Sequence, residues 1–168
     1  FSPDELTPPA EWKLLLTPDQ IDAAVSKLAS EIDAKFENDS REIVLVAILS
    51  GAVYFVVDLS RRLKHFHSIC FVSCSSYHNS QTQSEQVNIN PVSCSAKKLE
   101  GKIVILADEL YDNGLTLSSV GSYFSKEYKI DSTSLFSCVA FRKSKPHHAY
   151  EPPTFCGIDG LPDLWYVG

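Results

Sequence analysis

The sequence predicts an α/β protein with a largely parallel, twisted sheet flanked by helices. Short apolar runs rich in β-branched residues alternate along the chain with longer segments of helical periodicity. Strands separated by helices form βαβ units, in which the strands run parallel and are covered on both faces. A length of 168 residues and a hydrophobic content of 44% suit a single core, so we expect residues 1–168 to form one domain.

The first regular element is a helix predicted over residues 18–37. Thr17 stands at its N-cap, Pro18 at the first helical position and Gln20 at the capping-box position. An apolar side chain recurs at helical spacing, which indicates the face that packs on the sheet. These apolar positions are Ile21, Val25, Leu28, Ile32 and Phe36.

Further strands and helices then alternate. Each expected strand is a compact apolar run, and each expected helix separates two of them. We expect strands at residues 43–49, 69–75, 103–107 and 134–141, helices at 52–64 and 116–126, and shorter strands at 155–158 and 165–167. Residues 75–90 are dense in Ser, Gln, Asn and Thr, which predicts a long polar loop, either a lid over a site or a floppy surface excursion.

Composition excludes several classes of function. The formal net charge of −6 gives no electrostatic case for nucleic-acid binding, which depends on Lys and Arg. No apolar run approaches the roughly 20 residues that span a bilayer, and no signal peptide is recognisable, so we expect a cytoplasmic protein without a membrane partner. The five cysteines are odd in number and lack Cys-x-x-Cys spacing, which predicts buried thiols rather than disulfides or a zinc site.

The strongest candidate site follows the strand at residues 103–107. Asp108, Glu109 and Asp112 come directly after it, and crevices in open α/β sheets form at the carboxyl ends of strands. Two adjacent acids on a strand normally point to opposite faces. Carboxylates repel phosphate, so we expect these three to bind hydroxyls, a divalent cation or a proton.

The turn after the acids suits a phosphate group. Its residues are Asn113, Gly114, Leu115 and Thr116, which open the helix predicted next. They supply N–H groups, a hydroxyl and the positive end of a helix dipole. The alternative is an exposed acidic turn with Asp112 as the N-cap, but that leaves Gly and Thr at the helix entry unexplained. The implied ligand is a metal-bound sugar phosphate.

Two other loops are weaker candidates. Leu49, Ser50 and Gly51 end the first strand, where a small-residue turn could let backbone N–H groups approach an anion; an ordinary strand-to-helix turn is the alternative. Ser76 and Tyr77 stand at the root of the polar tract and could contact a ligand there.

Together the motifs resemble those of type I phosphoribosyltransferases, and the chain is similar to the hypoxanthine-guanine (6-oxopurine) branch. The acidic pair followed by Asp-x-Gly-x-Thr looks like the ribose-phosphate signature of that family. Four further segments are similar to its pyrophosphate loop, flexible catalytic loop, purine-reading segment and base-stacking segment. In that order they are Leu49-Ser50-Gly51-Ala52, Ser75-Ser76-Tyr77, Phe141-Arg142-Lys143-Ser144 and the run from Leu161 through Trp165-Tyr166-Val167 to Gly168.

The resemblance implies transfer of a 5-phosphoribosyl group from Mg²⁺-bound phosphoribosyl pyrophosphate to a 6-oxopurine. The base would be hypoxanthine or guanine, with xanthine as a further candidate, and the products IMP or GMP and pyrophosphate, as in purine salvage. The implied fold is the type I phosphoribosyltransferase fold with a small hood from the terminal segments. A homodimer or homotetramer is expected.

Residue roles are implied in the same way. Asp108 and Glu109 match the acids on the ribose and metal side, and Asp112 matches the catalytic acid near purine N7. Residues 112–116 would hold the 5′-phosphate. The backbone of residues 49–51 would meet pyrophosphate, and in the family the bond before the second residue of this loop is often a cis peptide.

The purine side leaves one alternative open. An ungapped comparison with the family's Lys-Arg-Thr places Arg142 at the Lys position, whereas the distance to Pro146 favours Lys143, which we prefer. Trp165 would stack on the base, and the backbone of Val167 or Tyr166 would bind its edge.

A second functional hypothesis is a regulatory homologue that binds nucleotide or phosphoribosyl pyrophosphate with weak or no turnover. The family's acidic pair usually reads Glu-Asp, whereas the order here is Asp108-Glu109. The family's chain also continues past the position of Gly168 with an Asp near a second metal and an Arg near pyrophosphate. We therefore expect the sequence to be truncated at its C-terminus.

Overall fold

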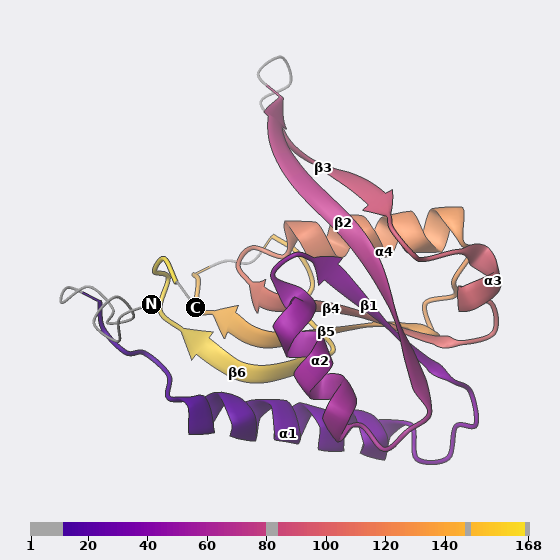
Figure 1. The fold of residues 1–168 in the computed structure, drawn as a ribbon. Coiled ribbons are helices and arrows are strands. Elements are labelled where there is room, and N and C mark those ends of the chain that lie inside the picture. Colours follow the sequence, from indigo (N-terminus) through magenta and orange to yellow (C-terminus); the bar gives the residue numbers. More distant parts are fainter. Residues whose placement is uncertain (1–11, 80–83, 147–148, 167–168) are drawn as a thin grey trace, which may run out of the picture.

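A six-stranded, mostly parallel sheet forms the centre of the molecule (Figure 1). The computed structural model describes residues 12–79, 84–146 and 149–166. The strand order is β3-β2-β1-β4-β5-β6, and every neighbouring pair is parallel except β2 with β3. The predicted α/β class with a largely parallel sheet is confirmed. The strands are β1 Ile43–Leu49, β2 His67–Asn79, β3 Ser84–Pro91, β4 Ile103–Tyr111, β5 Leu135–Lys143 and β6 Phe155–Leu161.

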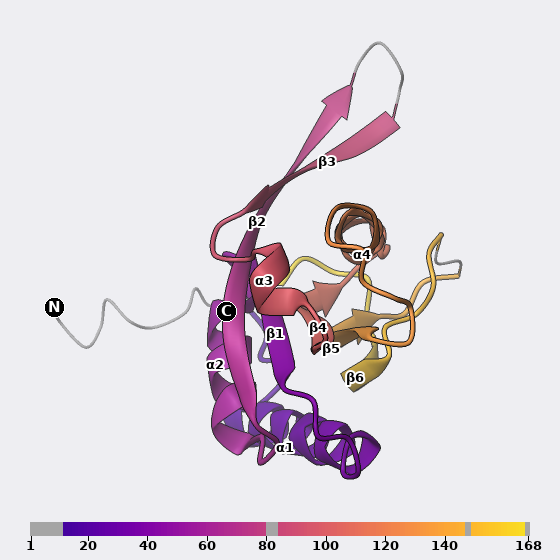
Figure 2. The ribbon, with the colours of Figure 1, turned by 90° about the vertical axis from the view of Figure 1, so that its right-hand side faces the viewer.

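Helices cover both faces of the sheet. Helices α1 (Pro18–Lys35) and α2 (Ala52–Arg62) lie on one face, and α4 (Leu115–Glu127) with the short α3 (Ala96–Leu99) lies on the other (Figures 1 and 2). Each face carries its own apolar cluster, because successive side chains of a strand point to opposite faces. The central strands β1 and β4 are therefore buried on both sides, as their continuous apolar runs predict.

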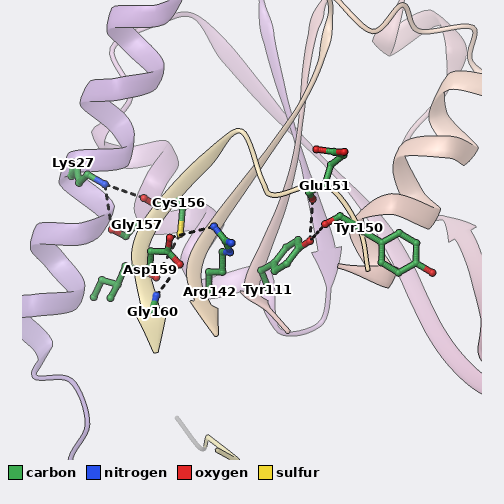
Figure 3. A network of polar contacts seen from close by, with 10 residues as sticks. Lys27, Tyr111, Arg142, Tyr150, Glu151, Cys156, Gly157, Asp159 and Gly160 are labelled. Atoms are coloured by element: carbon green, nitrogen blue, oxygen red, sulfur yellow. Dashed lines mark hydrogen bonds and ion pairs between the residues drawn. The ribbon is translucent and has the colours of Figure 1, made fainter. Parts of the chain in front are cut away.

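Helix α1 begins as its sequence predicts. The Thr17 side chain accepts a hydrogen bond from the Gln20 N–H, and the Gln20 side chain accepts one from the Thr17 N–H, which completes the capping box. Its buried face includes Leu28 and Ile32, whereas Ile21 in the first turn is 38% exposed. Lys27 donates to the carbonyl oxygens of Cys156 and Gly157 in β6, so α1 also holds the edge strand (Figure 3).

The polar tract at residues 75–90 is not the loop that its composition predicts. Most of it forms an antiparallel hairpin of β2 and β3, which projects beyond the rest of the sheet (Figures 1 and 2). Val87 and Ile89 are half-buried while Asn88 and Asn90 are exposed, a strand alternation in which polar residues fill the outer positions. A hairpin at the edge of a sheet is stabilised by hydrogen bonds between its two backbones and needs few apolar side chains. Its composition therefore does not predict it.

Two further boundaries differ from the prediction. β4 extends through residue 111 rather than ending at 107, which places Asp108 and Glu109 within the strand. The short strand predicted at residues 165–167 is wrong, because Trp165 and Tyr166 follow β6 without strand structure; Val167 lies outside the described residues. The remaining predicted elements form within a few residues of their expected ends. The predicted hood stays a prediction.

All five cysteines are free thiols. Cys70 and Cys138 are buried within the sheet, and Cys156 is half-buried in β6. The sulfur atoms of Cys70 and Cys94 lie 2.7 Å apart. The segment that follows β3 therefore packs against β2. Within the described ranges, no helix has both the length and the apolar character needed to cross a membrane.

Candidate active site

The candidate residues gather at the carboxyl ends of three neighbouring strands. β1 pairs in parallel with β4, and β4 with β5, so the loops that follow these strands leave the same edge of the sheet. The loop at residues 49–51, the acids of β4 and the end of β5 are thereby brought together. Two direct contacts confirm this proximity: Gly51 lies against the Glu109 carboxylate, and Asp112 forms an ion pair with Lys143.

The acidic pair is placed by the alternation of β4. Asp108 continues the alternation of Val104 and Leu106, and Glu109 that of Ile105 and Ala107, yet the two carboxyl groups lie close enough to interact. Asp108 Oδ1 accepts the Glu109 N–H at 3.0 Å. Burial, followed by the neighbouring Glu109 carboxylate, raises the pKa of Asp108 to about 8.

The oxygen atoms of this acidic pair suit a divalent cation. The raised pKa keeps Asp108 largely protonated at neutral pH in the metal-free protein, and a bound hard cation would favour its ionised form. Among the described residues, no three His, Cys, Asp or Glu side chains are grouped as a metal site. The pair would therefore supply at most part of a coordination shell, and a bound substrate would supply the rest.

Gly51 leaves the space that the Glu109 carboxylate occupies. A Cβ atom at position 51 would overlap that carboxylate, so the absence of a side chain makes room for it. The Leu49–Ser50 bond that precedes Gly51 is a cis peptide, as the resemblance implies. The small-residue turn after β1 and the acids of β4 are thus parts of one site rather than separate loops.

The turn after β4 has the geometry of an anion-binding helix entry. Gly114 is the N-cap of α4 with a φ of 89°, a left-handed conformation that favours glycine. Asn113 Oδ1 accepts the Leu115 N–H at 3.0 Å, and Thr116 lies in the first helical turn. Asp112 is not the N-cap, so the alternative of a simple acidic cap does not describe this turn.

Tyr111 packs against the turn that contains Gly114. Its ring is buried, and a Cβ atom on Gly114 would overlap its hydroxyl. The hydroxyl donates to the carbonyl oxygens of Tyr150 and Glu151, at 2.8 and 3.0 Å, in the connection between β5 and β6 (Figure 3). The structure shows that the hydroxyl ties the turn to a second loop.

Asp112 belongs to a cluster of two acids and two lysines. Its Oδ1 atom lies 2.5 Å from Lys145 Nζ and 3.4 Å from Lys143 Nζ. Both lysines also lie near Asp163 Oδ1, at 3.6 and 3.3 Å. Burial acts to raise the pKa of Asp112, but the two ammonium groups outweigh it and hold the pKa below its ordinary value.

The two candidates for reading the purine point to different surroundings. Lys143 is 8% exposed and faces Asp112, and its Nζ lies 5.6 Å from the centre of the Tyr166 ring. Arg142 instead pairs with Asp159 at 3.2 Å and lies over the Tyr111 ring (Figure 3). A pocket of about 370 Å³ lies at this end of β5 and β6. Its lining residues are Arg142, Lys143, Ser144, Lys145, Asp159 and Gly160.

In the described part of the chain, the structure does not bring the remaining predicted residues into contact with the acidic groups of the site. Trp165 is 91% exposed, and the Tyr166 ring rather than the Trp165 ring lies beside Lys143. Ser76 and Tyr77 pair with Val87 and Gln86 in the hairpin, and their side chains lie outside the described part of the chain.

Sequence reasoning missed Lys145 and Asp163. The available signal was the spacing Lys-x-Lys at the end of a strand, two like charges that need nearby acids. Nothing in the sequence places Asp163 beside them, because that contact depends on the pairing of β5 with β6.

Removing the Tyr111 hydroxyl should destabilise the protein modestly. Tyr111→Phe keeps the buried ring but removes the single hydroxyl proton that the two carbonyl oxygens share, so we expect a loss of about 1 kcal/mol in the free energy of unfolding. Urea denaturation measures this loss. Tyr54→Phe, at a side chain that is 86% exposed, is the control and should change little. Equal stabilities for the two variants would contradict the tether.

Because of Asp108, the free energy of unfolding of the metal-free protein should fall as the pH rises. The folded pKa of Asp108, about 8, lies above the ~3.9 of an unfolded carboxyl. Between these values the unfolded chain binds fewer protons than the folded chain, so the free energy of unfolding falls with increasing pH. Asp108→Asn should flatten this decline, being more stable than the wild type near pH 8 and closer to it near pH 5.

Urea denaturation in chelator-containing buffer across this pH range provides the measurement. Asp58→Asn, which changes an exposed carboxylate on α2, should keep the pH dependence of the wild type. A wild-type slope in Asp108→Asn would show that the Asp108 carboxyl is not the group responsible.

Comparisons with known proteins agree with this geometry. The sequence profile of the phosphoribosyl transferase domain matches residues 12–158. A hypoxanthine phosphoribosyltransferase of Buchnera aphidicola is 32% identical over 93% of this chain and 85% of its own. A hypoxanthine-guanine phosphoribosyltransferase of Mycobacterium avium is 31% identical over 99% of this chain and 81% of its own.

Solved structures show the same architecture. The crystal structure of a hypoxanthine-guanine phosphoribosyltransferase from Bacillus anthracis superposes with a TM-score of 0.72 at 27% identity, over 92% of this chain and 84% of its own. The hypoxanthine phosphoribosyl transferase of Trypanosoma cruzi, at 22% identity over 92% of this chain and 83% of its own, shares the fold with a TM-score of 0.77. The chain therefore belongs to the phosphoribosyltransferase family, in the branch of the hypoxanthine(-guanine) phosphoribosyltransferases.

Proposed function

We propose that this chain transfers a 5-phosphoribosyl group from phosphoribosyl pyrophosphate to a 6-oxopurine, giving the nucleotide and pyrophosphate. The observation that carries the proposal is the meeting of the Gly51 loop, the Asp108-Glu109 pair and the Gly114 turn at one sheet edge. A pyrophosphate, a ribose diol and a 5′-phosphate need these three kinds of partner. The names of relatives that span most of the chain support the same reaction.

The ribose phosphate would lie between the acids and the turn. The first N–H groups of α4 have no acceptor within the helix, and Asn113 Oδ1 already accepts that of Leu115. The N–H groups of Gly114 and Thr116 can therefore donate to the 5′-phosphate. Asp108 and Glu109 would bind the ribose hydroxyls and, on the metal side, Mg²⁺. A bound Mg²⁺ would neutralise charge on the departing pyrophosphate. The same two carboxylates would favour the positive charge that develops on the ribose ring.

Asp112 would act at the purine. Asp112 is ionised at neutral pH, as an ordinary Asp is, and the two lysines stabilise this form further, so it can accept the proton from purine N7 while N9 attacks the ribose. Lys143 would donate to the exocyclic oxygen of the base, because it emerges beside Asp112 whereas Arg142 is paired with Asp159. Trp165 stays the predicted stacking residue, with the backbone of residues 166–167 at the edge of the base.

The oligomeric state and the cellular location are also proposals. A homodimer or homotetramer is expected from the resemblance, with a partner surface on α2, where Tyr54 and Val57 are exposed. A single domain over residues 1–168 and a cytoplasmic location stay predictions.

An activity assay tests the proposed function. The protein is incubated with Mg²⁺, phosphoribosyl pyrophosphate and, separately, hypoxanthine, guanine, xanthine or adenine, and pyrophosphate release is measured. We expect turnover with at least one 6-oxopurine and none with adenine. Tight binding of phosphoribosyl pyrophosphate without release with any base would overturn the enzyme and favour the regulatory homologue.

A substitution of Asp112 tests its proton role. Asp112→Asn should lower kcat by ~10²- to 10⁴-fold, because the amide cannot accept the N7 proton, while the KM values change much less. Steady-state kinetics with the preferred base provide the measurement. Asp19→Asn, in the exposed first turn of α1, is the control and should keep wild-type kcat. Full turnover in Asp112→Asn would remove the assigned role.

A further inference from the structure

Among the residues that the structure describes, Lys145 is the cationic side chain nearest to the proposed catalytic acid. It follows the end of β5 by two residues, and its Nζ lies 2.5 Å from Asp112 Oδ1. The corresponding distance from Lys143, the proposed purine-reading residue, is 3.4 Å. The Asp112 Oδ1 atom itself is buried, so the position of this carboxylate depends on the few polar groups around it.

The charged groups around Asp112 form an alternating arrangement. From the end of β5 come Lys143 and Lys145, and from the segment after β6 comes Asp163, whose Oδ1 lies 3.3 and 3.6 Å from the two lysines. Tyr166 faces Lys143 through its ring, and Glu109 lies three residues before Asp112 on β4. Each lysine contacts both acids, so the removal of one lysine leaves two carboxylates with a single ammonium group.

The two lysines face different demands. In the proposed function Lys143 turns toward the exocyclic oxygen of the purine, and an ammonium group engaged there is less available to Asp112. Lys145 has no such competing role in the structure. Its side chain is 22% exposed, against 10% for Lys143, so it reaches Asp112 from the rim of the site.

We propose that Lys145 is a positioning residue that holds the Asp112 carboxylate in place and keeps it ionised while Lys143 binds the purine. This inference rests on the proposed function, because it assigns Lys145 a task in the same reaction. Lys145 does not itself contact reacting atoms. The ion pair is shared with Asp163, so Lys145 also links the turn after β4 to the segment that carries Trp165.

The pH profile of kcat/KM for the base, at saturating phosphoribosyl pyrophosphate, tests the proposal. Loss of the Lys145 charge makes Asp112 easier to protonate, so the acidic limb of the Lys145→Met profile should lie at higher pH than that of the wild type, and the two profiles should converge toward pH 8.5. Lys145→Arg keeps the charge and should follow the wild type. Lys97→Met, at an exposed position of α3, is the matched control. A Lys145→Met profile that parallels the wild type would overturn the proposal.

A second measurement does not depend on turnover. The carboxyl carbon of Asp112 is followed by ¹³C NMR as the pH is varied in substrate-free protein, with Asp112→Asn used to assign the signal. We expect the midpoint of this titration at higher pH in Lys145→Met than in the wild type. Lys145→Gln replaces Lys145→Met if circular dichroism shows that it is the better folded of the two. Unchanged midpoints would overturn the role of Lys145. Absence of turnover in the wild type would instead refute the proposed function. The NMR titration would still show whether Lys145 lowers the pKa of Asp112.

Discussion

The parallel pairing of β1, β4 and β5 is the constraint on which the site depends. Each pair is held by its backbone ladder, with Ala47 opposite Ala107 and Ala107 opposite Cys138. Because the three strands run in the same direction, the loops that follow them leave one edge together. Residues far apart in the chain then lie within contact distance without any long loop having to fold onto the site. The apolar side chains on both faces of β1 and β4 make this edge rigid.

Two acids four positions apart in β4 and its turn have opposite electrostatic surroundings. Asp108 is desolvated beside another carboxylate, and its pKa is raised; Asp112 lies beside two ammonium groups, and its pKa is lowered. Environments that separate the pKa values of neighbouring carboxyls commonly assign them different chemical roles. The first surroundings suit a cation and sugar hydroxyls, and the second suit a carboxylate that stays ionised to receive a proton. The backbone brings both into one site.

Much of this arrangement was predictable from the sequence, and the exceptions share a cause. Continuous apolar runs locate β1 and β4, and the Thr17 capping box locates the start of α1, because these signals are local. The β2–β3 hairpin escapes prediction because its stability comes from backbone pairing that polar side chains do not reveal. Lys145 and Asp163 escape because their contact depends on the register of two strands. Sequence therefore locates the motifs, whereas charge partners from different strands require the structure.

The close approach of Gly51 to Glu109 couples the two positions sterically. The longer acid occupies the space that a side chain at position 51 would need. With the shorter Asp at position 109, the same space would be partly vacated, and a small side chain at position 51 would become tolerable. The side chain at position 51 and the length of the acid at position 109 therefore compete for one volume. A larger residue at position 51 requires the flexible end of Glu109 to move away from the loop.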